Sequence, residues 1–182
     1  MIIAITGTPG TGKTSVAERL KKNDFKVIDF NKLACENNWL IVKDENRDSN
    51  IVDIKKFDNF IKENYKSEDI IFIEGHLSHL LRNIDKIILL RCHPDKLRNN
   101  LSNKKWNQVK IKENIEAEIL DIILCESIDI HPKNNIFEID VTKKSVNKVT
   151  SNILEIIENK FKIMKKYKIG KIDWSEEILN EF

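Results

Sequence analysis

The sequence predicts an α/β fold in which helices cover both faces of a parallel β-sheet. Two observations support this: short apolar runs alternate with helix-forming stretches, and some of these runs are nearly continuous in apolar residues, as in strands buried on both faces. Connections between such strands are right-handed, and a ligand is expected at their carboxyl ends. With 182 residues, the chain is long enough for one domain with a substantial core.

Five runs are predicted to form the sheet. MIIAIT at residues 1–6, DIIFIE at 69–74 and KIILL at 86–90 are mainly apolar. FKVIDF at 25–30 and IFEI at 136–139 complete the set.

Helices are predicted between these strands from the spacing of apolar residues. We expect four of them over residues 15–20, 31–37, 52–64 and 113–128. Another begins at Pro94, because proline is favoured in the first helical turn. Thr142 or Ser145 caps a long final helix, whose apolar positions keep a helical period to Met164. Residues 43–50 (KDENRDSN) are polar throughout, which predicts a loop.

The most specific signal is Gly7–Thr14 (GTPGTGKT), which matches the phosphate-binding pattern G-x-x-x-x-G-K-[ST] at every fixed position. It lies between a predicted strand and a predicted helix, as the pattern requires. Glycines such as Gly10 and Gly12 let backbone N–H groups point at an anion, and the helix adds its positive end. Lys13 suits the β- and γ-phosphates, and the Thr14 hydroxyl suits Mg²⁺. The loop motif therefore predicts a site for the phosphates of a nucleotide together with Mg²⁺.

Composition argues against several other classes of protein. Charged residues make up 33% of the chain but the net charge is only +2, which disfavours bulk electrostatic binding of nucleic acid. Cys35, Cys92 and Cys125 have no paired spacing, so we expect reduced thiols and neither a disulfide framework nor a zinc site. No signal peptide and no apolar run of about 20 residues is found, so we expect a cytoplasmic protein without a membrane partner.

A second cue is the strand end at residues 73–76 (IEGH). An acid that closes an apolar strand is a common place for a carboxylate near Mg²⁺, so Glu74 is a candidate metal and catalytic residue. His76 could orient a water molecule or polarise a phosphate oxygen. Strand-end acids and loop histidines also occur without any catalytic role, and for His79 we favour a capping or loop histidine.

A polar segment over residues 103–112, with four lysines and Trp106, separates two predicted helices. It could close over a triphosphate as a lid that excludes water and supplies positive charge. The alternative is a solvated charged loop, in which a tryptophan would be unusual. We interpret the acids of the following helix as a solvated face: Glu113, Glu116, Glu118, Asp121 and Glu126.

The region between the second and third predicted strands, residues 31–66, could hold the phosphate acceptor. Its basic candidates are Lys32, Lys43 and Arg47. Their spacing selects none of the three.

Four blocks of the sequence resemble the adenylate kinase isoenzyme 6 family, in its shorter archaeal form. They are ITGTPGTGKTSVAERL (5–20), IEGHLSHLL (73–81), the stretch from LLRCHPDKL to IEAEIL (89–120), and EIDVTKKSVNKV (138–149) with the tail GKIDW (170–174). The first block is general to P-loop proteins. The second and third discriminate this family from others.

The resemblance implies a P-loop kinase fold of three layers, α/β/α, with a central five-stranded parallel sheet. It implies a single domain over residues 1–182, an acceptor (nucleoside monophosphate-binding) region over 31–53 and a lid over 103–113. The implied reaction is ATP + AMP ⇌ 2 ADP, with accompanying ATPase activity. It further implies a role in small ribosomal subunit maturation, with the eleventh small-subunit ribosomal protein and small-subunit rRNA precursor as partners.

Transferred by motif, the family's functional residues fall on the positions already discussed and on one more. Ser15 joins the ATP-binding set, which then reads Gly10, Gly12, Lys13, Thr14 and Ser15. Glu74 is the strand-end acid and His76 the family histidine.

Two segments depart from the family pattern. The lid usually begins R-L-x-x-R-G-[YW], but residues 100–106 read NLSNKKW, so both arginines and the glycine are absent. Lys104 keeps one charge without the bidentate fork of an arginine, and Arg98 could compensate. Cys35 stands where the acceptor helix of the family has an arginine. These losses should weaken transfer to a nucleotide more than ATP binding.

We therefore predict in-line phosphoryl transfer to AMP or another nucleoside monophosphate, with Lys13, Glu74, His76 and Lys104 as catalytic residues. Two alternatives stay open. One is an ATPase switch in ribosome assembly, suggested by the missing arginines and by a lysine-rich C-terminal helix over 160–168. The other is a small-molecule kinase of the dephospho-coenzyme A or cytidylate type.

Overall fold

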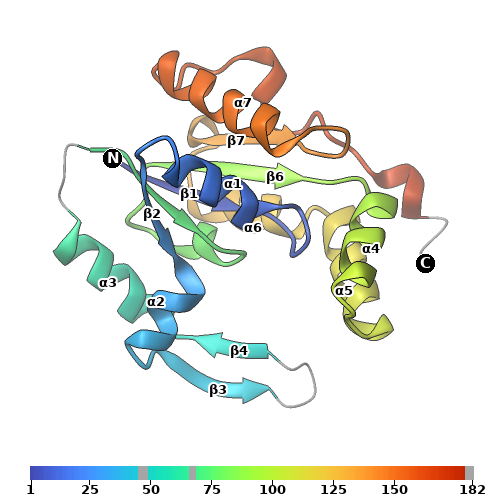
Figure 1. Cartoon of the computed structure of the whole chain (residues 1–182), viewed down its shortest axis with the longest axis horizontal. Coiled ribbons are helices and arrows are strands. Elements are labelled where there is room, and N and C mark those ends of the chain that lie inside the picture. The colour runs from blue at the N-terminus through green and yellow to red at the C-terminus, as the bar shows by residue number, and fades with distance from the viewer. Residues whose placement is uncertain (45–48, 66–68, 179–182) are drawn as a thin grey trace.

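Five parallel strands form the central sheet of the computed structural model, which describes residues 1–44, 49–65 and 69–178 (Figure 1). The strand order is β2-β5-β1-β6-β7. Their bounds are Ile2–Thr6 (β1), Lys26–Asp29 (β2), Ile71–Glu74 (β5), Lys86–Arg91 (β6) and Ile136–Asp140 (β7). The predicted parallel sheet is confirmed. The chain moves outward to opposite sides of β1, which opens a crevice at the carboxyl end of β1.

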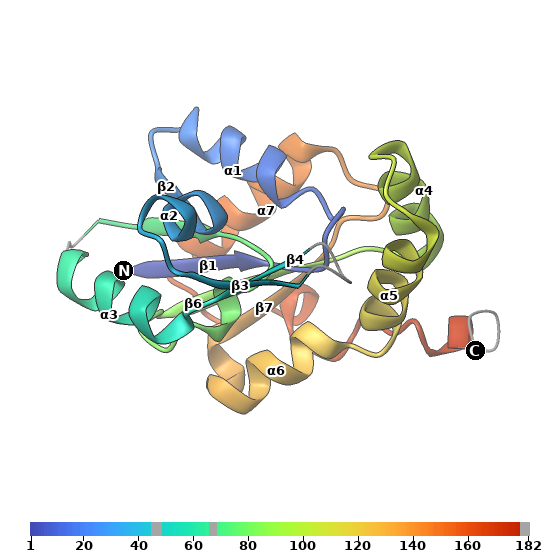
Figure 2. The same ribbon diagram turned by 90° about the horizontal axis from the view of Figure 1, so that it is seen from below.

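Helices pack on both faces of this sheet, as Figure 2 shows for α1 and α7 on one side and α6 on the other. Their bounds are Lys13–Lys21 (α1), Phe30–Glu36 (α2), Ile54–Asn64 (α3), Ile122–Ile130 (α6) and Val146–Glu158 (α7). On β1, Ile3 and Ile5 belong to the apolar cluster of α1 and α7. Ile2 and Ala4 belong to the cluster of α2, α3 and α6. Both faces of β1 are therefore buried, which explains its continuous apolar sequence.

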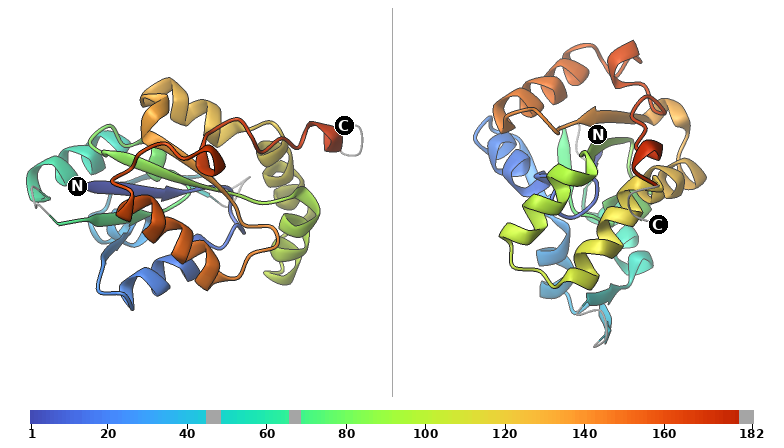
Figure 3. Two further views of the ribbon diagram at one scale, coloured as in Figure 1. Left: turned by 90° about the horizontal axis from the view of Figure 1, so that it is seen from above. Right: turned by 90° about the vertical axis from the view of Figure 1, so that its right-hand side faces the viewer.

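Two helices, α4 (Pro94–Asn103) and α5 (Gln108–Ile119), form a hairpin beyond the carboxyl ends of the strands (Figure 3). They have a small core of their own, built from Leu97, Leu101, Ile111, Ile115 and Ile119. The sequence predicted residues 103–112 to be a segment between helices, and this was wrong for most of it. The Asn107 side chain accepts from the backbone N of Lys110 at 2.7 Å and so begins α5 early, which leaves only residues 104–107 as the connection.

Residues 43–50, predicted to be a loop, belong in part to a separate antiparallel hairpin. Its strands are β3 (Leu40–Asp44) and β4 (Ser49–Val52), and residues 45–48 lie outside the described part of the chain. The prediction failed because backbone pairing needs no apolar side chains. The backbone N of Asp53 donates to the carbonyl of Trp39 at 2.8 Å, which closes the base of the hairpin.

Two further predictions about helices need correction. The stretch 113–128 is not one helix, because Asp121 takes a left-handed φ of 55° and separates α5 from α6. The final helix, capped by Ser145, ends at Glu158. Lys160 and Phe161 have φ values of 53° and 56°, so the lysines over 160–168 follow the helix and do not form part of it.

Candidate active site

A cleft of about 1170 Å³ lies at the carboxyl ends of the strands, and four parts of the chain line it. The phosphate-binding loop contributes Thr8, Pro9, Gly10, Gly12, Lys13, Thr14 and Ser15. The region after β2 contributes Asn31, Lys32, Cys35, Leu40 and Val52. The end of β5 and helix α6 contribute Glu74, His76, Leu77, His79, Ile123 and Glu126. The α4–α5 hairpin contributes Asn100, Asn103, Lys104, Trp106, Lys110, Glu113, Asn114 and Ala117.

The loop backbone needs glycine at its first position. Gly7 has a φ of 141°, and a Cβ there would lie 2.4 Å from the carbonyl oxygen of Leu90. Gly12 has a φ of 90° and precedes α1, whose first backbone N–H groups have no partner within the helix. The Thr11 hydroxyl oxygen is the one buried side-chain polar atom without a hydrogen-bond partner among the described residues. An orphaned hydroxyl beside free helix N–H groups fits a loop built to hold an anion.

Lys13 lies at the floor of the cleft, with only 7% of its surface exposed. Its Nζ donates to the carbonyl oxygens of Gly7 at 2.7 Å and Thr8 at 3.2 Å. Burial lowers the pKa of Lys13 to about 8, although the negative charge of Glu74 opposes this change. At pH 7 the side chain is therefore still mainly an ammonium group.

Glu74 and Thr14 meet across the cleft floor. Glu74 ends β5, which pairs with β1, and the Thr14 hydroxyl donates to its Oε1 at 3.3 Å. Burial raises the pKa of Glu74, while the positive charge of Lys13 lowers it. A hydroxyl and a carboxylate are hard oxygen donors of the kind that Mg²⁺ prefers, so this pair fits the predicted metal.

The two histidines after β5 differ in their surroundings. His76 lines the cleft, and burial, followed by the charge of Lys13, lowers its pKa to about 4. It is therefore neutral at pH 7. His79 is buried, with Nδ1 at 3.0 Å from the Thr6 hydroxyl and Nε2 at 2.9 Å from Glu126 Oε2. The sequence favoured a capping or loop histidine, and the structure places His79 in the 3₁₀ turn Ser78–Leu80, where it is buried and hydrogen-bonded.

Among the basic candidates for the acceptor side, Lys32 has a described side chain. Lys32 reaches the cleft from α2 but is 71% exposed, with its Nζ 3.8 Å from Glu36. Cys35 lies one turn further along the helix, on the same cleft wall. Lys43 lies in β3, and Arg47 lies outside the described residues.

The α4–α5 hairpin contacts the phosphate-binding loop directly. Asn100 donates to the carbonyl oxygen of Gly10 at 2.9 Å. Lys104 lines the cleft close enough for its charge to lower the pKa of Lys13. Trp106 also lines it, and Lys110 Nζ lies 4.6 Å from the centre of the Trp106 ring. Arg98 is not among the cleft-lining residues in the described part of the chain.

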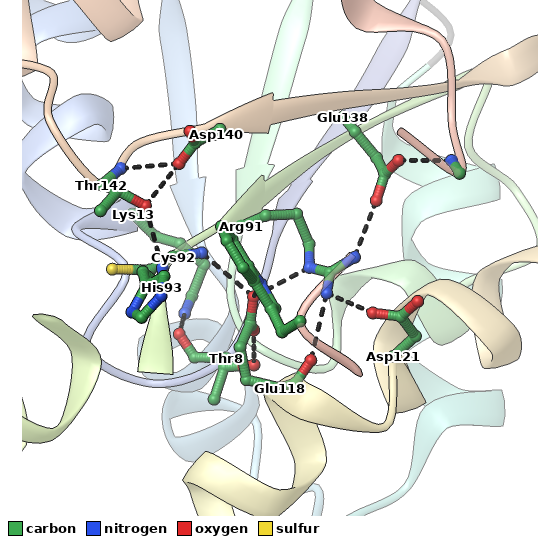
Figure 4. A network of polar contacts seen from close by, with 12 residues as sticks. Thr8, Lys13, Arg91, Cys92, His93, Glu118, Asp121, Glu138, Asp140 and Thr142 are labelled. Atoms are coloured by element: carbon green, nitrogen blue, oxygen red, sulfur yellow. Dashed lines mark hydrogen bonds and ion pairs between the residues drawn. The ribbon is translucent and has the colours of Figure 1, made fainter. Parts of the chain in front are cut away.

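A buried polar network behind the loop, shown in Figure 4, was not predicted from the sequence. Glu118, interpreted as part of a solvated face, is 3% exposed and contacts Thr8 and Arg91. The available signal was its position, because Ile111, Ile115 and Glu118 follow one face of α5 at helical spacing.

No helix in the described ranges is both long and apolar enough to cross a membrane.

Comparisons with known proteins agree on both sequence and fold. A family model described as an AAA domain matches residues 3–121. A curated "Putative adenylate kinase" from Methanocaldococcus jannaschii is 40% identical over 178 residues, covering 97% of this chain and 94% of its own. Another protein of that name, from Archaeoglobus fulgidus, is also 40% identical, covering 98% of this chain and 94% of its own.

Two solved structures share the architecture at low sequence identity. Shikimate kinase from Acinetobacter baumannii has a TM-score of 0.62 at 12% identity, covering 87% of this chain and 93% of its own. Thymidylate kinase from Candida albicans has a TM-score of 0.55 at 18% identity, covering 88% of this chain and 92% of its own. At such identities the likeness shows the fold alone.

Proposed function

Because this chain belongs to the family of archaeal proteins named "Putative adenylate kinase", with an AAA domain and the P-loop kinase fold, we propose that it is a nucleotide kinase. Its reaction would be ATP + AMP ⇌ 2 ADP. The observation that carries this proposal is one continuous cleft with two unlike halves. One half is the phosphate-binding loop with its lysine. The other has apolar walls suited to a flat base, formed by Leu40, Val52, Leu77 and Ile123.

The loop half would hold the triphosphate. Backbone N–H groups of the loop and of the first turn of α1, including Ser15, would bind phosphate oxygens, and Lys13 would bind the β- and γ-phosphates. Thr14 and Glu74 would hold Mg²⁺, directly or through water. When bound, this ion neutralises charge on the β- and γ-phosphate oxygens.

In the transfer step, a phosphate oxygen of AMP attacks the γ-phosphorus, and the bond from that phosphorus to the β–γ bridging oxygen breaks. The chain's main task is to hold these atoms in line and to stabilise charge. His76 is neutral, so it would orient the attacking group by a hydrogen bond and would not act as a cation. Lys104, which is part of the predicted lid over residues 103–113, would approach the γ-phosphate from the α4–α5 hairpin.

A second candidate function is an ATPase with little kinase activity, in which water replaces AMP as the attacking group. The observation in its favour is the acceptor wall, where Cys35 stands in place of the arginine that the resemblance leads us to expect. The partners implied by the resemblance, a small-subunit ribosomal protein and rRNA precursor in the cytoplasm, belong with this candidate. A kinase of the dephospho-coenzyme A or cytidylate type is a third candidate on the same fold.

The test is ADP formation from ATP·Mg²⁺ with and without a panel of acceptors, beside Lys13→Ala. Kinase activity predicts that AMP stimulates turnover and that two ADP form for each ATP consumed. Slow turnover that is indifferent to every acceptor would favour the ATPase. Stimulation by dephospho-coenzyme A or CMP alone would favour the third candidate.

A further inference from the structure

Glu118 is a buried carboxylate to which the proposed reaction assigns no role. It lies on α5, next to the apolar residues Ile115 and Ile119, and is 3% exposed. Burying a carboxylate is strongly unfavourable unless it is paired and hydrogen-bonded. The partners of Glu118 should therefore show what its burial achieves.

Four hydrogen bonds hold the carboxylate of Glu118, and the Arg91 side chain also donates to its backbone carbonyl (Figure 4). Oε1 accepts from Arg91 Nε at 2.8 Å, from the backbone N of Cys92 at 3.0 Å and from Trp174 Nε1 at 3.4 Å. Oε2 accepts from the hydroxyl of Thr8 in the phosphate-binding loop. Its backbone carbonyl accepts from Arg91 Nη2 at 3.1 Å. The orientation of this carboxylate is thus determined from several sides.

Arg91 connects Glu118 to the sheet. It ends β6, is 2% exposed, and donates from Nη1 to Glu138 of β7 at 2.8 Å. It also donates from Nη2 to Asp121, which lies between α5 and α6. The guanidinium therefore holds helix α5 against the two strands β6 and β7 through three carboxylates.

Thr8 connects Glu118 to the reaction site. The Thr8 side chain is 2% exposed, and its only hydrogen bond in the described part of the chain is the one to Glu118. The backbone carbonyl of Thr8, together with that of Gly7, accepts from Lys13 Nζ. A shift of Thr8 would therefore shift the backbone that holds the phosphate-binding lysine.

We propose that Glu118 is a positioning residue: through Thr8 it fixes the start of the phosphate-binding loop relative to the sheet and to the α4–α5 hairpin. The loop that would carry the triphosphate is then held in a fixed position relative to the hairpin that would cover it. The effect on catalysis rests on the proposed function, whereas the effect on the loop does not.

The most selective perturbation removes the Thr8 hydroxyl and keeps Glu118. Removing Glu118 itself would leave Arg91 without a main partner and could prevent folding. Thr8→Val has nearly the same shape as threonine but no hydroxyl, and Thr8→Ser keeps the hydroxyl. Glu116→Gln is the matched control on α5, because Glu116 is partly exposed and pairs with Lys112 at 3.6 Å.

The first readout is hydrogen–deuterium exchange of the amides over residues 7–14, measured without nucleotide so that no phosphate contact of Thr8 contributes. We expect exchange in Thr8→Val to be about tenfold faster, the change that loss of a hydrogen bond to a charged group produces. Thr8→Ser and Glu116→Gln should exchange like the wild type. Exchange in Thr8→Val within about twofold of the wild type would overturn the proposal.

The second readout is steady-state kinetics with ATP and AMP. A positioning role predicts that kcat of Thr8→Val falls about tenfold while KM for ATP changes less than about threefold, and that Thr8→Ser recovers most of the loss. Equal losses in Thr8→Val and Thr8→Ser would contradict a role for the Glu118 contact. If the wild type transfers no phosphoryl group, the proposed function fails alone, and the exchange data still decide whether Glu118 positions the loop.

Discussion

Replacing Lys13 by methionine should stabilise the protein near neutral pH while abolishing its activity. Burial lowers the pKa of Lys13 from 10.5 to about 8, so the folded state disfavours the charged form. At 1.36 kcal/mol per pH unit, this difference corresponds to a destabilisation of about 3 kcal/mol by the charge. Methionine has a similar length, suits a buried position and carries no charge.

The sign of this effect depends on pH. Below pH 8, Lys13 is charged in the folded and unfolded states, and the wild type bears the full cost of burying the charge. Above pH 10.5 the amine is neutral in both states, and the cost vanishes. Stability of the wild type should therefore rise relative to Lys13→Met as pH increases from 8 to 10.5, by about 3 kcal/mol in total.

The lost hydrogen bonds reduce the gain but hardly alter its pH dependence. Lys13 donates to the carbonyls of Gly7 and Thr8, and each bond contributes about 1 kcal/mol. We expect Lys13→Met to be more stable than the wild type by about 1 kcal/mol at pH 7 and less stable at pH 10.

Urea unfolding at several pH values, beside ATP turnover, measures this. Lys62→Met on α3 is the control, because Lys62 is exposed and its replacement should change stability little at any pH. A stability difference between Lys13→Met and the wild type that stays constant from pH 7 to pH 10 would refute the argument that burial of this charge is costly.

Three further substitutions test separate parts of the site. Cys35→Arg should lower KM for AMP about tenfold, because it restores a bidentate phosphate ligand on the cleft wall. The control Cys125→Arg, on an exposed part of α6, should leave KM unchanged. Equal KM values in the two variants would show that the cleft wall at Cys35 does not face the acceptor phosphate. Glu74→Gln should raise the Mg²⁺ concentration for half-maximal turnover about tenfold, and an unchanged requirement would remove Glu74 from the metal site. Gly7→Ala should lower the free energy of unfolding, measured by heat or urea, by more than about 2 kcal/mol, because its Cβ would lie 2.4 Å from a backbone oxygen. Gly12→Ala, which has open space around its Cβ, should lower it by about 1 kcal/mol. Equal losses in the two variants would show that the close approach at Gly7 is unimportant.

Features that depend on neighbouring residues were predictable from the sequence. Gly7–Thr14 is a local motif, and Glu74 follows from a strand that ends in an acid. The five strands were found because burial on both faces leaves continuous apolar runs such as residues 86–90. Parallel pairing then brings the ends of β1 and β5 together, so the loop and Glu74 had to be neighbours.

Features that depend on distant partners were not predictable. The burial of Glu118 requires Arg91, which lies 27 positions earlier, and nothing near Glu118 in the sequence signals that pairing. Residues 43–44 and 49–50 pair through their backbones in the β3–β4 hairpin, and their polar side chains give no clue to this pairing. The left-handed turn at Asp121 has no glycine or proline to mark it.

The most direct test of the central claim follows the γ-phosphate itself. Wild-type protein is incubated with ATP labelled at the γ-phosphorus, Mg²⁺ and AMP, and the labelled products are separated. Nucleotide kinase activity predicts label in the β-phosphate of ADP, formed only when AMP is present and absent in Lys13→Ala. Label that appears only as inorganic phosphate, at the same rate with and without AMP, would contradict the account and identify water as the acceptor.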